Sequence, residues 1–174
     1  MTRHVYADGE ALTAANLNVS VNPLFALKTA TETVNNSTTM QNDDHLFLTT
    51  MSINATYLVK LFIIYESTTQ TPDLVLGFTV PSGASFQWVP FSLTSNNANS
   101  EASVGAGYVR MPSTTTSSTR FIGTMTTEVA SLPVGVLTMA GNSGTFRLQW
   151  AQGVATAENT QVKANSLLSM WRIA

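Results

Sequence analysis

From about residue 28 to the end of the chain, apolar and polar residues alternate with a period of two, and turn-forming residues interrupt them at short intervals. In SGTFRLQWAQ (143–152), Phe146, Leu148 and Trp150 fall on one face and the polar residues between them on the other. Such alternation is typical of half-buried β-strands, and many short strands between turn signals favour an all-β sandwich. We expect strands at 28–34, 45–51, 55–66, 73–80, 85–93, 102–111, 120–129, 133–140, 144–151 and 166–173.

The first part of the chain follows a different pattern. Apolar residues recur there at helical spacing, Thr13 is a suitable N-cap, and Pro23 should end or kink the helix. We therefore divide the chain into a short attachment segment, 1–27, and a β-sandwich domain, 28–174. The segment packs either on its own domain or on another protein, and the residues expected to make the contact are Leu12, Leu17, Val21, Leu24 and Phe25.

One strand is apolar on both of its faces. In ATYLVKLFIIYE (55–66), Leu58, Phe62 and Ile64 lie on the face opposite Tyr57 and its apolar neighbours, and SLLSMWRI (166–173) is similar. A strand that is apolar on both faces is covered on both, whereas a two-sheet sandwich covers only one. We expect a homo-oligomer whose subunit interface contains Leu58, Phe62, Ile64, Leu168 and Met170. The alternative is a single domain whose own loops cover these strands.

Composition narrows the range of partners. The 174 residues include no cysteine, only 10% are charged, and the formal net charge is −2. A nucleic-acid-binding surface would need a patch of Lys and Arg, and the eight basic residues form no run. The longest apolar stretch, LVKLFIIY at 58–65, is too short to span a membrane. We expect neither nucleic acid nor membrane as a partner.

No group of residues predicts an enzyme. There is no GxSxG nucleophile elbow, and most of the ten acidic residues lie in turn-rich segments or near the termini. In QNDDHLF (41–47), the two Asp residues and His45 suggest either a metal site or a turn in which Asp bonds its own backbone, and the turn is favoured. We expect no catalytic residue, metal or cofactor. Trp88, in SFQWVPF, is the candidate for a contact with a glycan.

Several segments, in order along the chain, resemble one group of proteins. These are DGEALTAANLN (8–18), STTMQNDDHLFLTTMSINATYLVKLFIIYES (37–67), LGFTVPSGA (76–84) and the closing GTFRLQWAQGVATAENTQVKANSLLSMWRIA (144–174). They are similar to virion surface proteins of tailed phages of actinobacteria. In the closing segment, the matching residues are Leu148, Gln149, Trp150, Ala151, Gln152, Ala164, Ser166, Leu167, Leu168 and Arg172.

The resemblance implies a jelly roll of the tumour-necrosis-factor/C1q type, usually trimeric, on the surface of a phage particle. It leads us to expect a non-enzymatic capsid decoration or head-spike protein, anchored to the major capsid protein through residues 1–27. The chain lacks the collagen-like or coiled-coil shaft of longer tail fibres. The alternative is a tail-fibre or minor tail protein that binds a receptor, such as a glycan of the host cell surface.

Overall fold

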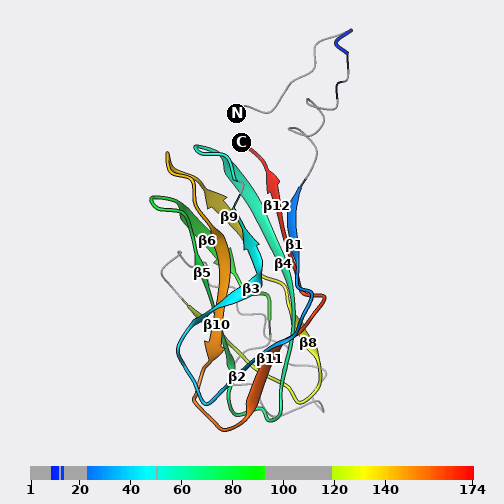
Figure 1. The fold of residues 1–174 in the computed structure, drawn as a ribbon, viewed down its shortest axis with the longest axis vertical. Coiled ribbons are helices and arrows are strands. Elements are labelled where there is room, and N and C mark those ends of the chain that lie inside the picture. The colour runs from blue at the N-terminus through cyan, green and yellow to red at the C-terminus, as the bar shows by residue number, and fades with distance from the viewer. Residues whose placement is uncertain (1–8, 12, 14–22, 50, 93–118) are drawn as a thin grey trace.

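Strand β4 (Thr56–Ser67) is 12 residues long and forms the axis of the larger of two sheets. On one of its sides it pairs with β12 (Leu167–Arg172) and then with β11 (Asn159–Val162). On the other side it pairs with β9 (Val134–Thr138) and then with β8 (Val129–Ser131). The computed structural model describes residues 9–11, 13, 23–49, 51–92 and 119–174 (Figure 1).

Among the described residues, three short strands complete the larger sheet and four strands make the smaller one. β1 (Leu24–Leu27) pairs with β12, β2 (Glu32–Asn35) with β11, and β6 (Ser85–Val89) with β9. The smaller sheet has the order β3 (Gln41–Leu48), β10 (Phe146–Gln152), β5 (Leu74–Thr79) and β7 (Arg120–Ile122). All pairings are antiparallel, so the prediction of an all-β antiparallel sandwich is confirmed.

The core between the sheets is built from the inward residues of each strand. Phe146, Leu148 and Trp150 of β10 are fully buried, as the alternation in SGTFRLQWAQ predicts. Phe78 of β5 contacts Phe86 edge-on, with 5.0 Å between the ring centroids. Such edge-to-face pairs stabilise a core beyond the area they bury.

The structure corrects several predicted strand bounds. QNDD (41–44), expected as a turn, forms the first half of β3, and the segment 120–129 is divided between β7 and the start of β8. Strand β11 was not predicted, because NTQV has a single large apolar residue. The expected strand at 102–111 lies outside the described residues.

The predicted boundary after residue 27 is also corrected, because Leu24–Leu27 forms β1 and pairs with β12 of the sandwich. Leu24 is half-buried against the core, and Phe25 is 68% exposed. Leu12, Leu17 and Val21 lie outside the described residues. In the part of the chain that the structure describes, no helix has the length and hydrophobicity needed to cross a membrane.

Candidate functional site

Three of the outward residues of β4 are apolar, although this side of the strand does not face the core. Leu58, Phe62 and Ile64 alternate with the buried residues of the strand and point away from the smaller sheet. Phe62 is 42% exposed, and Leu58 and Ile64 are half-buried. The sequence prediction that β4 carries a second apolar face is therefore confirmed for these three residues.

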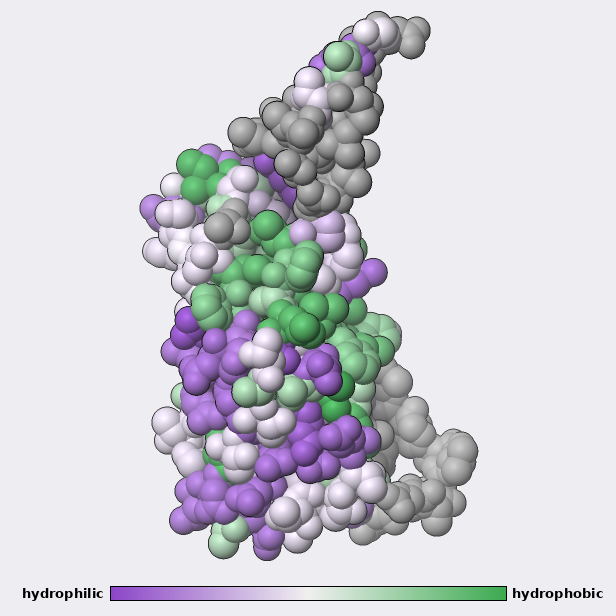
Figure 2. Space-filling view, turned by 45° about the vertical axis from the view of Figure 1, so that its right-hand side comes forward, coloured by the Kyte–Doolittle hydropathy of each residue, from purple (hydrophilic) through white to green (hydrophobic). Residues whose placement is uncertain are grey.

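Neighbouring strands extend this surface. Leu58 lies opposite Trp171 of β12 and Val136 of β9, and Phe62 lies opposite Leu167. We call this surface the outer apolar face, and it consists of Phe25, Leu27, Leu58, Phe62, Ile64, Val134, Val136, Leu167 and Trp171. On the side of the molecule that Figure 2 presents, hydrophobic side chains gather over the half that carries β1 and β12, and hydrophilic ones dominate the other half.

Two residues predicted for the subunit interface belong to the core instead. Leu168 and Met170 lie opposite Leu61 and Val59 of β4, on its inner side, and both are fully buried. Alternation along β12 separates its two faces correctly, but it does not say which face turns inward. Trp171, on the other face, is 37% exposed.

Charged groups are few on the outer apolar face and more frequent beside it. Lys60 of β4 lies on this face, with its Nζ 5.5 Å from the centroid of the Trp171 ring. Further along the same side of β4, Lys163 Nζ lies 2.6 Å from Glu66 Oε1 and 3.8 Å from Glu128 Oε1. The larger sheet thus presents an apolar half and a polar half.

Trp88 does not lie on the surface. It is 1% exposed in β6, and its ring contacts Phe78 edge-on with a centroid distance of 4.8 Å. The prediction that Trp88 contacts a glycan is therefore wrong. Strand β6 follows the same alternation as the other strands, and Phe86 and Trp88 lie on its buried side.

A second group of side chains lies where β3 is distorted. Residues Arg147 and Gln149 of β10 lie opposite Phe47 and Asn42, so two steps along β10 correspond to five along β3. Within this bulge, Asp43 Oδ1 accepts hydrogen bonds from the backbone N–H groups of His45 (3.0 Å) and Leu46 (2.8 Å). The predicted backbone bonding of Asp43 is confirmed, but it occurs inside a strand.

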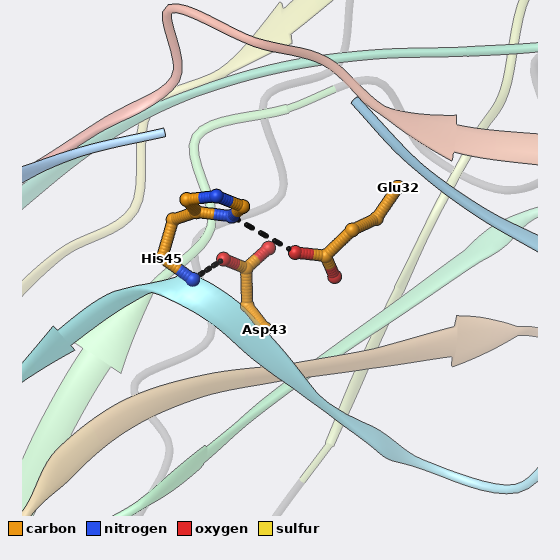
Figure 3. Close-up of side chains that lie close together, drawn as sticks. All are labelled: Glu32, Asp43 and His45. Carbon is orange, nitrogen blue, oxygen red and sulfur yellow. Dashed lines mark hydrogen bonds and ion pairs between the residues drawn. The ribbon is translucent and has the colours of Figure 1, made fainter. Parts of the chain in front are cut away.

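The bulge brings three potential metal ligands together. Glu32, Asp43 and His45 each offer one ligand atom, and these atoms all lie within 4.8 Å of one another. Figure 3 shows the Glu32 carboxylate and the His45 ring converging on Asp43, with His45 Nδ1 3.1 Å from Glu32 Oε1. The sequence indicated Asp43 and His45 together, but it gave no sign of Glu32.

A cation of the protein itself already lies in this cluster. Lys28 Nζ is 2.8 Å from Asp43 Oδ2 and 2.5 Å from Glu32 Oε1, and the side chains of Lys28 and Asp43 are fully buried. A buried ammonium between two carboxylates offsets one of their two negative charges and would repel a metal ion at close range. The cluster is therefore better described as an ionic link between the two sheets than as a metal site.

No family model, no curated protein and no solved structure matches this chain.

Proposed function

We propose that this chain is a non-enzymatic structural protein of a phage virion, and that it works as a homotrimer. The observation that carries the proposal is the outer apolar face. Phe25 is 68% exposed, Phe62 42% and Trp171 37%, and they lie on neighbouring strands of one sheet. Burying such a surface between subunits stabilises an assembly in proportion to the apolar area removed from water.

The size of the face supports a subunit contact. The exposed parts of the three aromatic side chains alone offer on the order of 300 Å² of apolar area, which reaches the range of the largest patch on a typical monomer. A standard interface takes roughly 800 Å² from each partner, so the aliphatic members and the polar half of the sheet would have to take part in the contact as well.

A second copy of this chain is the partner that the charges favour. The net charge is only −2, so two copies repel each other weakly. The single Lys60 on the outer apolar face is close to Trp171, and the ring offers a favourable environment for the ammonium when water is removed. A strongly acidic or basic partner would find little to pair with on this face.

The strand order supports a jelly roll. Three positions in the larger sheet are each filled by two consecutive strands placed one after the other. These pairs are β1 with β2, β8 with β9, and β11 with β12. If each pair is counted as one strand and β6 is left out, the described strands can be numbered from one to eight in chain order. In the larger sheet, the first of these eight lies beside the eighth, the eighth beside the third and the third beside the sixth. In the smaller sheet, the second lies beside the seventh, the seventh beside the fourth and the fourth beside the fifth. This order is the one expected of an eight-stranded jelly roll, and it supports that part of the proposal.

The position on the virion rests on the resemblance of the sequence to phage surface proteins. In this proposal, the residues that precede β1 attach the protein to the major capsid protein or to a tail protein. Immunogold labelling of particles of the encoding phage tests this placement. Label on the head supports a decoration protein or spike, label on the tail supports the minor tail alternative, and unlabelled particles contradict a virion role.

Light scattering of the purified chain tests the assembly. We expect the wild-type chain to have the mass of three subunits and Phe62→Asp to be monomeric, because the substitution removes the exposed ring at the centre of the outer apolar face and adds a charge that is costly to bury. The matched control is Phe121→Asp, since Phe121 is 55% exposed but lies in β7 of the smaller sheet. A trimer that survives Phe62→Asp with unchanged stability would show that the interface lies elsewhere.

A further inference from the structure

We propose that Lys28 and Asp43 join through an intramolecular isopeptide bond, with Glu32 as the group that carries the protons. The proposal does not depend on the proposed function. Lys28 Nζ lies 2.8 Å from Asp43 Oδ2, and both side chains are fully buried between the sheets. Glu32 Oε1 lies 2.5 Å from the same nitrogen, and the Glu32 side chain is 17% exposed.

The Asp43 carboxyl is positioned like the electrophile of an acyl-transfer reaction. Its Oδ1 accepts the backbone N–H groups of His45 and Leu46, at 3.0 and 2.8 Å. When an amine attacks Cγ, negative charge develops on one carboxyl oxygen, and two fixed N–H donors stabilise that oxyanion. The other oxygen, Oδ2, faces Lys28 and is placed to leave.

The reaction is a condensation that needs no oxidant or cofactor. Glu32 takes one proton from the Lys28 ammonium and passes it to Asp43 Oδ2, which leaves a neutral amine beside a neutral acid. The Nζ lone pair attacks Cγ, a C–N bond forms, and the charge moves to Oδ1. Glu32 then carries a second proton from nitrogen to Oδ2, the Cγ–Oδ2 bond breaks, and one water leaves.

The surroundings favour the amide over the ion pair. Both side chains are fully buried, and the amide that forms carries no charge. Lys28 and Asp43 are held in contact, so their reaction needs no bimolecular encounter. Effective molarities of about 10⁵–10⁸ M are known for reacting groups that are fixed in this way. The released water leaves a site from which solvent is excluded, and this opposes hydrolysis.

Asp43, rather than Glu32, is the carboxyl that reacts. The hydrogen bonds recorded for Glu32 fall on Oε1, the oxygen that also touches Lys28: it accepts from the Asp44 N–H at 3.0 Å and lies 3.1 Å from His45 Nδ1. Asp43 instead divides its contacts, with two N–H donors on Oδ1 and Lys28 on Oδ2. In a tetrahedral intermediate one oxygen carries the negative charge and the other leaves, so this division of contacts suits the reaction.

Intact mass spectrometry of the full-length chain, with folding checked by circular dichroism, tests the bond. We expect the wild-type mass to be lower than the sequence mass by one water, and we expect trypsin not to cleave after Lys28. Asp43→Asn should lose one ammonia instead. Glu32→Gln, which keeps the shape of the site without its proton carrier, and Lys28→Arg should both retain the full mass.

Three results would overturn the proposal. The first is a folded wild-type chain that keeps its full mass after prolonged incubation. The second is a loss of water that persists in Lys28→Arg, because the condensation would then lie elsewhere. The third is a loss of water that persists in Asp43→Ala, because the amide would then have formed with Glu32.

Discussion

Among single residues, Asp73 has an unfavourable charge in the folded protein. Burial raises its pKa from 3.8 to about 6, and its backbone has φ 50°, in the left-handed region that Asn also tolerates. Because the folded-state pKa is the higher one, the contribution of Asp73 to stability is fully present below about pH 4 and is lost as the pH rises through about 6.

Replacing Asp73 with Asn should therefore stabilise the protein at neutral pH. Asn keeps the left-handed backbone and the size of the side chain but never carries the charge. We expect Asp73→Asn to have a higher free energy of unfolding than the wild type at pH 7 and an equal one near pH 4, measured by urea denaturation at both pH values. If the free energies of unfolding of the variant and the wild type differed by the same amount at both pH values, the charge of Asp73 would not be the cause.

Gly135 is required where β9 passes the aromatic core. A Cβ at this position would lie 2.4 Å from the Gln87 carbonyl oxygen, 2.6 Å from Phe86 Cε2 and 2.7 Å from Trp88 Cβ. Gly135→Ala should lower the free energy of unfolding by about 1–3 kcal/mol, or more, because the backbone oxygen cannot move aside. Gly141→Ala is the control, since a Cβ there has no neighbour within 4 Å. Similar urea midpoints for the two variants would contradict this interpretation.

Among the elements, β3 shows what the sequence predicts and what it does not. The alternation from His45 onward predicts its second half, and NDD correctly indicates that Asp43 bonds its own backbone. The strand nevertheless begins before the bulge, because β10 supplies partners for Gln41 and Asn42. That pairing joins residues more than a hundred positions apart, and local pattern carries no information about it.

The same limit applies to the faces of the strands and to the ionic cluster. Two-residue alternation separated Leu168 and Met170 from Trp171 correctly, but only the register with β4 decides which side is inside. The sequence predicts a strand from Lys28 onward and gives no sign that this side chain is buried, because Lys is usually exposed. Its burial depends on Asp43 and Glu32, which the fold brings to it.

The ionic cluster should stabilise the contact between the sheets. Asp43→Ala removes the partner of the fully buried Lys28, whether the two are paired as ions or joined as the proposed amide, and leaves the N–H groups of His45 and Leu46 without their acceptor. Removing one member of a buried ion pair costs about 3–5 kcal/mol, and we expect a loss of that size in urea denaturation. Asp44→Ala is the matched control, since the Asp44 side chain is exposed and only its backbone N–H contacts Glu32. Equal losses in the two variants would show that the cluster does not stabilise the fold.

At the scale of the whole molecule, stability and assembly should be linked. If the outer apolar face is buried between copies, the folded assembly contains several chains and the unfolded state contains one, so mass action raises the unfolding temperature with protein concentration. We expect the wild-type midpoint to rise steadily over a hundredfold range of concentration, measured by scanning calorimetry. Phe62→Asp should unfold at one temperature throughout that range, because its monomer loses no subunit contact on unfolding. A wild-type midpoint that does not change with concentration would mean that the exposed Phe25, Phe62 and Trp171 stabilise no assembly.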